Sequence, residues 1–222
     1  MKSLAQASDL APKKRPVQQR SQATFDALVE AATGLLVERG YARTTTNHIA
    51  ERAGVGIASL YEYFPGKDAI VAQIADRLVA RVLERLGTGA ARATDGSEAD
   101  AMRHWIEWIH DTMAREKELI AVFLYQVPFT EELESIRSVR EQLLTFSRRV
   151  RLHSGGPIRR DVSDTTLHLV VNLVTSTILQ LLFDPPHDVS RRALLTELAL
   201  RLDEWLREDA GSAQPVRVRL RP

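Results

Sequence analysis

The side chains best suited to binding a polyanion lie in one stretch, TTTNHIAERAGVGIASLYEYFPGK, which runs from Thr44 to Lys67. Threonine, serine and tyrosine hydroxyls and the lysine ammonium group donate to phosphate oxygens, and exposed side chains of a short helix can read base edges. The chain has no cysteine, which excludes disulfides, thiolate metal sites and cysteine nucleophiles. The sequence also offers no Ser/His/Asp set, HExxH sequence or phosphate-cradling glycine loop. These residue types favour binding over catalysis.

Two short helices are predicted within this stretch, at residues 46–53 and 57–64, and a turn at Gly54 joins them. Glycine adopts the positive φ that such a turn needs, and Thr45 is placed to cap the first helix with its hydroxyl. The side chains expected in the core are Ile49, Ala50, Ala53, Val55, Leu60 and Phe64. Two short helices joined by a tight glycine turn make a helix-turn-helix.

The order and density of these residues resemble the DNA-binding region of the TetR family of bacterial transcriptional regulators. The residues that match are Thr44, Thr45, Ile49, Ala50, Ala53, Gly54, Val55, Ser59, Leu60, Tyr61, Tyr63, Phe64 and Lys67. This specific resemblance covers residues 20–70, and the rest of the chain is similar in architecture only. Three residues depart from the family's usual pattern: Gly56 replaces a frequent Ser, Ile57 a common Lys and Glu62 a frequent His. They put the operator sequence in question rather than the DNA-binding role.

The resemblance implies that the second short helix enters the major groove of DNA. The side chains that would then face base edges are Ile57, Ala58, Ser59 and Glu62. Those that would bind phosphates are Thr45, Tyr61, Tyr63 and Lys67, while Gly56 would cap the recognition helix by leaving its amides open. Tyr63 keeps two interpretations, the edge of the core or a phosphate donor. His48 is interpreted as solvated or close to a phosphate rather than as a metal ligand.

The remainder of the chain has the periodicity of helices. We expect an all-α fold of about nine helices, with a three-helix DNA-binding domain before a helical bundle. The expected helices run from about Phe25 to a left-handed cap at Gly40, then over 67–86, 102–113, 119–127, 136–150, 164–183 and 190–207, with a loop at 87–97. The expected domains are a basic arm at 1–19, the helix-turn-helix domain at 20–66, an effector-binding and dimerisation domain at 67–209 and a basic tail at 210–222.

Charge is unevenly distributed along the chain, although the formal net charge is only +1. Residues 1–67 carry 9 Lys and Arg against 6 Asp and Glu, whereas residues 68–222 carry 21 against 23. The N-terminal excess lies in Lys13, Lys14, Arg15 and Arg20. We expect this arm to be disordered until it meets a polyanion, and a solubilising tail is the alternative. A near-neutral chain argues against a non-specific nucleoid-type binder.

No segment is predicted to span a membrane, because polar residues interrupt the most apolar stretch, 167–183. The N-terminus carries no recognisable secretion signal, so a cytoplasmic location is expected. The same apolar stretch belongs to the helix 164–183, which is apolar almost all round and needs more than one face covered. Together with the helix 190–207 it predicts a homodimer through a four-helix interface, the alternative being the centre of a monomeric core. Two recognition helices about 34–36 Å apart would read a palindrome.

An effector site is expected in the bundle, and several of its residues are candidates for lining that site. The candidate residues are Trp105, Trp108, Met113, Phe123, Tyr125, Phe129, Phe146, His168 and Asn172. Aromatic and Met side chains at helical spacing are also ordinary core residues, so that interpretation stays open. The scarcity of convergent charge favours a large hydrophobic effector.

The leading hypothesis is therefore a homodimeric repressor that a small hydrophobic ligand releases from a palindromic operator in double-stranded DNA, with no cofactor and no metal. Such a ligand needs only to prefer the state in which the two recognition helices are out of register. The alternative is a helical lipid-binding or small-molecule-binding protein, or an enzyme, with an incidental helix-turn-helix. His104, Glu107 and His110 have a spacing that a metal would accept, but a solvated helix face is favoured.

Overall fold

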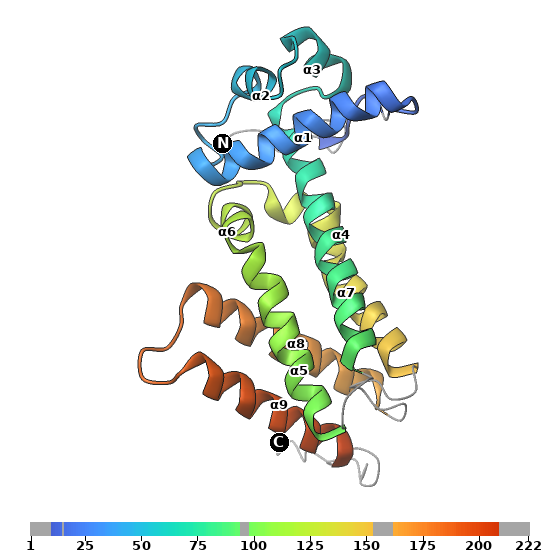
Figure 1. Ribbon diagram of the computed structural model, residues 1–222, viewed down its shortest axis with the longest axis vertical. Helices are drawn as coiled ribbons and strands as arrows, with labels where there is room; N and C mark the ends of the chain where they lie inside the picture. Colours follow the sequence, from blue (N-terminus) through green and yellow to red (C-terminus); the bar gives the residue numbers. More distant parts are fainter. Residues whose placement is uncertain (1–9, 15, 94–97, 153–161, 209–222) are drawn as a thin grey trace, which may run out of the picture. The chain divides into compact units, whose positions relative to one another are not determined.

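The computed structural model describes residues 10–14, 16–93, 98–152 and 162–208. Across these residues the chain forms nine α-helices and no β-strand (Figure 1), as the helical periodicity predicts. The helices are α1 (Gln19–Arg39), α2 (Thr46–Arg52), α3 (Ile57–Tyr63), α4 (Lys67–Ala93), α5 (Glu98–Arg115), α6 (Lys117–Tyr125), α7 (Glu134–Leu152), α8 (Asp164–Phe183) and α9 (Arg191–Glu208). The all-α prediction is confirmed.

Local capping residues set several of the helix ends. The Ser163 hydroxyl accepts a hydrogen bond from the Thr166 amide at 3.0 Å, so α8 begins where its N-cap predicts. Ser190 caps α9 in the same way. Gly40 ends α1 with a φ of 77° and a ψ of 169°. The positive φ is as expected for glycine, but the extended ψ means that the cap is not the left-handed helical one that was predicted.

Helix α4 continues past the point where the sequence predicts a loop. It runs to Ala93, so the expected break at 87–97 is wrong for residues 87–93. A Cβ atom on Gly89 would overlap the Trp108 ring, and the Trp108 indole N–H donates to the Arg85 carbonyl at 2.9 Å. Tertiary packing thus overrides the low helix propensity of glycine, because Gly89 gives the indole room against the helix backbone.

The chain divides into two compact units, each described here by itself. The first comprises residues 1–82 and 115–140, and the second comprises residues 83–114 and 141–222. Helices α4 and α7 therefore contribute residues to both units. This division by packing differs from the predicted functional boundary at residue 67, which stays a prediction.

The core of the first unit forms where α1 meets α3. The Phe25 ring stacks on Phe64 with 4.8 Å between ring centroids, and Tyr63 meets the same ring edge-on at 6.0 Å. Arg77 of α4 lies over the Phe25 ring and pairs with Asp26 of α1. Aromatic and cation–π contacts therefore hold α3 against α1 and α4.

In the second unit, Trp105 of α5 stacks on Phe146 of α7 with 5.9 Å between centroids. His110 of α5 is buried, at 2% exposure, and its Nδ1 lies 3.0 Å from the neighbouring Asp111 carboxylate. The prediction of a solvated helix face is therefore wrong for His110, because this residue lies on the buried face of α5. In the described part of the chain, no three His, Asp or Glu side chains are grouped as a metal site.

Helix α8 is long and apolar enough, by length and composition alone, to cross a membrane. Its apolar window has a mean hydropathy of 1.6, because the polar residues that interrupt it are mostly uncharged Thr, Ser and Asn, and 39% of that window is buried. The prediction that no segment spans a membrane stays a prediction. The core helix of a soluble protein passes the same test, so one such helix is weak evidence for a membrane span.

Candidate nucleic-acid interface

The turn between α2 and α3 has the geometry of a helix-turn-helix. Gly54 adopts a φ of 68°, and its amide donates to the Glu51 carbonyl at 3.1 Å. The following amide, that of Val55, donates to the Ala50 carbonyl at 3.0 Å. A Cβ atom on Gly54 would meet open space, so backbone conformation, and not crowding, is the reason for glycine at this position. The predicted turn is confirmed.

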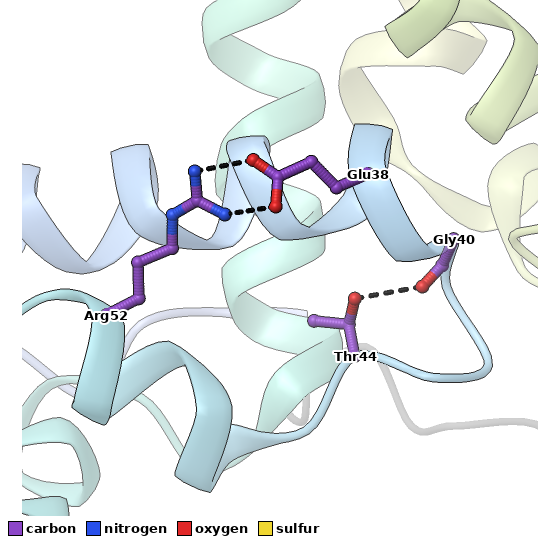
Figure 2. A network of polar contacts seen from close by, with 4 residues as sticks. All are labelled: Glu38, Gly40, Thr44 and Arg52. Atoms are coloured by element: carbon purple, nitrogen blue, oxygen red, sulfur yellow. Dashed lines mark hydrogen bonds and ion pairs between the residues drawn. The ribbon is translucent and has the colours of Figure 1, made fainter.

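Polar contacts hold α2 and its preceding loop to α1, as Figure 2 shows. The Arg52 guanidinium donates two hydrogen bonds of 2.6 Å to the Glu38 carboxylate and thereby lowers the pKa of that carboxyl. A Cβ atom on Gly34 would lie 3.0 Å from Arg52 Nη2, so this glycine lets the guanidinium lie against α1. Thr44 is buried and donates to the Gly40 carbonyl at 2.8 Å. Because the ion pair is exposed, it orients α2 more than it stabilises the fold.

The N-termini of the two short helices are capped differently. The Thr45 hydroxyl accepts from the His48 amide at 3.3 Å, which confirms the predicted cap of α2. Gly56 precedes α3 with extended backbone and no side-chain cap. The first amides of α3 therefore carry no capping side chain, as expected when Gly replaces Ser.

The side chains of α3 divide into a buried face and an exposed face. Leu60 and Phe64 are completely buried, at 0% exposure, as predicted. The predicted base-reading residues Ile57, Ala58 and Glu62 are exposed, and Ser59 is half-buried. Helix α2 also has a buried face, which includes Ile49 and Ala50.

Val55 and Ala53 depart from the core prediction. Both are only half-buried. They lie at the turn, where two seven-residue helices are too short to cover the connecting residues from solvent. Of the residues expected in the core of the motif, these two are the exceptions.

Among the predicted phosphate-binding tyrosines, only Tyr61 presents its side chain to solvent, with 44% exposure. Its hydroxyl lies 3.2 Å from the Thr46 hydroxyl at the start of α2. Two hydroxyl groups of the kind that donates to phosphate oxygens therefore lie side by side. The Tyr63 ring is buried against Phe25, which favours the interpretation as a core-edge residue. A phosphate role for Tyr63 stays a prediction.

Lys67 begins α4, where its ammonium group is held by Tyr41. Its Nζ donates to the Tyr41 carbonyl at 2.9 Å and lies 3.7 Å from the Tyr41 ring centroid. Burial lowers the pKa of Lys67, and the neighbouring Asp68 partly opposes that effect. Tyr41 in turn donates to Asp68 at 2.6 Å, and burial together with this carboxylate raises the pKa of the Tyr41 phenol. Lys67 must therefore share its ammonium with Tyr41 if it also binds a phosphate.

Tyr41 also connects the DNA-binding helices to the segment that follows α6, within the same compact unit. Its amide donates to the Gln126 side-chain oxygen at 3.1 Å, and its ring meets Phe129 edge-on at 5.9 Å. A Cβ atom on Gly40 would overlap that Gln126 oxygen. Residue spacing does not predict the contact between Tyr41 and Gln126, because the two residues are 85 positions apart in the sequence. The one local indication of this contact in the sequence is the glycine at position 40, which adopts a positive φ.

The N-terminal basic segment contacts the end of α3 where the structure describes it, at residues 10–14. The Lys13 amide donates to the Tyr63 carbonyl at 2.7 Å, and Lys13 Nζ donates to the Tyr61 carbonyl at 3.3 Å. The carbonyls at the end of α3 offer this segment hydrogen-bond acceptors, and the expectation of an arm that is disordered until it meets a polyanion stays a prediction. Arg15 and residues 1–9 lie outside the described residues, as does the basic tail.

The predicted effector residues are divided between the two units. Phe123 and Tyr125 belong to the first unit, where Phe123 is buried and Tyr125 is exposed. The second unit holds buried Trp105, half-buried Trp108, Met113, Phe146 and His168, and exposed Asn172. The structure pairs Trp105 with Phe146, and all of the effector assignments stay predictions.

A groove of about 490 Å³ opens elsewhere, between the N-terminal segment, α1 and α4. It is lined by Pro16, Gln22, Phe25, Gln73, Asp76, Arg77 and Ala80. None of the predicted effector residues lines this groove.

A buried helix pair with a positive-φ turn and one exposed helix face defines a helix-turn-helix protein of the DNA-binding class. Residues 28–74 match the family described as bacterial regulatory proteins, tetR family. Residues 28–74, which include α2 and α3, therefore carry the DNA-binding region of that family.

Curated proteins and solved structures are similar to this chain over different lengths. An uncharacterized HTH-type transcriptional regulator of Bacillus subtilis, YuxN, is 25% identical over 126 residues, which are 54% of this chain and 41% of the relative. The match thus spans about two fifths of that relative's length. The fatty acid degradation regulator FadR of Bacillus halodurans has the same fold, with a TM-score of 0.59, 16% identity and coverage of 86% and 96% of the two chains. FadR of Thermus thermophilus, a TetR family transcriptional repressor solved in complex with lauroyl-CoA, has a TM-score of 0.51, 23% identity and coverage of 81% and 93%.

Proposed function

We propose that this chain is a homodimeric transcriptional repressor that places α3 in the major groove of a palindromic operator. The observation that carries the proposal is the two-sided character of α3. Leu60 and Phe64 anchor one face in the core, while Ile57, Ala58 and Glu62 on the other are exposed. A rigidly held helix with a solvent-exposed face meets the requirement for reading base edges. Tyr61 of α3 and Thr45, the N-cap of α2, supply hydroxyl groups that can donate to phosphates.

Selection of bound duplexes from a random-sequence library tests this function. We expect an inverted repeat whose half-sites are centred one helical turn, about 34–36 Å, apart. Recovery of sequences with no common element would contradict operator recognition. The experiment requires no knowledge of the genes that the protein controls.

The exposed carboxylate of Glu62 is proposed to read a base by accepting from a cytosine amino group. Glu62→Ala should therefore change the preferred base at one position of each half-site, by about 1–3 kcal/mol of discrimination, and leave dimerisation intact. Repeating the library selection with this variant measures the change. An identical selected sequence would remove Glu62 from the base-reading residues.

The proposed dimer interface is formed by α8 and α9. Leu169 and Leu173 of α8 are 51% and 44% exposed, and Leu200 of α9 is also exposed, so each helix presents apolar side chains that the single chain leaves uncovered. A second copy of the same helix pair would bury these side chains in an isologous four-helix arrangement. Such burial also accounts for the apolar character of α8 without a membrane.

Leu173→Glu should convert the dimer to a monomer, because it would place two carboxylates in an apolar interface. Sedimentation velocity measures the change. Leu124→Glu is the matched control, since Leu124 is an exposed leucine of α6 outside the proposed interface. A Leu173→Glu protein that remains dimeric would contradict this interface, as would a wild-type protein that is monomeric at micromolar concentration.

The proposed effector is a large hydrophobic molecule bound in the helical bundle, and the protein is proposed to be cytoplasmic and not an enzyme. Trp105 stacked on Phe146 supplies apolar surface in the second unit, and lauroyl-CoA, which occupies the Thermus thermophilus relative, is the first compound to test. Helix α4 contributes to both compact units, so a change in its tilt can reach α3. A coupling free energy of about 1–3 kcal/mol changes operator affinity by about 5–150-fold.

A further inference from the structure

The N-terminal basic segment, residues 10–14, contacts the C-terminal end of α3. Lys13 donates its amide to the Tyr63 carbonyl and its ammonium to the Tyr61 carbonyl, at 2.7 and 3.3 Å. Both acceptors lie in the last turn of α3, whose carbonyls have no partner within the helix. That last turn contains no basic residue of its own. Lys13 therefore supplies the positive charge that the C-terminal end of a helix favours.

This docking fixes the position of the next residue, Lys14. Two hydrogen bonds hold Lys13 at the end of α3, and the Lys14 Cα lies about 3.8 Å from the Lys13 Cα. The Lys14 side chain is exposed and has no polar partner within the described part of the chain. Arg20, in the first turn of α1, is exposed as well. An unpaired ammonium group is thus held beside the helix that the proposed function places in the major groove.

We propose that residues 10–14 form a second DNA-contacting element, in which Lys14 binds the phosphate backbone that flanks the major groove occupied by α3. The proposal rests on the function proposed above, because it places α3 against DNA. A segment that served only for solubility would gain nothing from being anchored to the recognition helix. The anchored arrangement instead brings Lys14 to the operator without the entropy cost of ordering a free arm.

Phosphate binding by Lys14 has a measurable signature, since each neutralised phosphate contributes about 0.9 to the slope of log K against log salt concentration. In a dimer, Lys14→Gln should lower the magnitude of this slope by about 1.8. Wild-type protein should consequently lose about tenfold more affinity than the variant between 50 and 200 mM salt. The affinity for operator and for unrelated duplex should fall by the same factor, because a phosphate contact does not read sequence.

The experiment measures fluorescence anisotropy of full-length protein on its selected operator at several salt concentrations. Arg140→Gln is the charge-matched control, because Arg140 is an exposed residue of α7, outside the helix-turn-helix. Ethylation interference on the same duplex locates the contact. We expect one phosphate per half-site at which ethylation weakens wild-type binding and leaves Lys14→Gln unaffected.

Three results would overturn the proposal, and they are distinguishable. If wild-type protein binds its operator specifically and Lys14→Gln has the wild-type salt slope and interference pattern, the second contact is refuted and the proposed function stands. If wild-type protein shows no preference for any duplex, the proposed function and this contact fail together. A slope that falls equally in Arg140→Gln also refutes the contact, because the effect would then be one of net charge.

Discussion

Ala58→Glu should reduce operator affinity by at least about a hundredfold while leaving the fold intact. Ala58 is exposed in α3, so a longer side chain there meets no core residue. In the proposed complex the new carboxylate faces the negatively charged groove and adjacent phosphates, and like-charge juxtaposition in an interface costs several kcal/mol. Fluorescence anisotropy on the operator measures the loss, and thermal unfolding followed by circular dichroism checks the fold.

Thr145→Glu is the control for this prediction. It adds the same charge at an exposed position of α7, in the second unit, and should leave operator affinity within about threefold of wild type, since surface substitutions outside an interface have small effects. Wild-type affinity in Ala58→Glu would show that α3 does not enter the groove. The role given to the exposed face of α3 would then be wrong.

Phe64→Ala should destabilise the DNA-binding unit by about 3–5 kcal/mol. Phe64 is completely buried, and its ring stacks on Phe25. Removing the ring leaves a cavity at the junction of α1 and α3, so the recognition helix loses the anchor that fixes its orientation. Urea denaturation followed by circular dichroism measures the free energy of unfolding, and operator affinity should fall with it.

Leu124→Ala provides the comparison for the Phe64 prediction. Leu124 lies in the same unit, but it is 49% exposed, so its truncation should cost less than about 1 kcal/mol. An unfolding midpoint for Phe64→Ala that matches the one for Leu124→Ala would contradict the placement of Phe64 at the centre of this core.

The parts of the fold that were predicted correctly depend on neighbours in sequence. Thr45 and Ser163 cap helices through amides three residues away, and Gly54 turns the chain through its own φ. The buried positions of α3 follow from the spacing of Leu60 and Phe64 along one helix face. Each of these features is determined within a few residues, so the residue types alone indicate it.

The features that were missed depend on partners far along the chain. Gly89 does not break α4, because Trp108 of another helix packs over it. Lys13 contacts α3 because its acceptors, the carbonyls of Tyr61 and Tyr63, end that helix about 50 residues later. No local pattern announces such contacts, since they exist only once the helices have packed.

The effector assignments show the same limit. Aromatic residues at helical spacing are typical both of a hydrophobic core and of the lining of a pocket. Only the packing of the helices shows which of these two environments each residue has. Trp105 and Phe146 do meet, whereas Tyr125 lies exposed in the other compact unit. The sequence therefore identified the apolar character of the bundle but not which of its residues lie together.

The most direct test of sequence-specific operator recognition by a dimer is a fluorescence anisotropy titration of the selected duplex. The titration is run at two salt concentrations in the presence of scrambled competitor, and the stoichiometry is read at saturating protein. We expect binding that survives the competitor, with two protomers per duplex at both salt concentrations. Binding that scrambled DNA abolishes at equal concentration, or that saturates at one protomer per duplex, would contradict the proposed function.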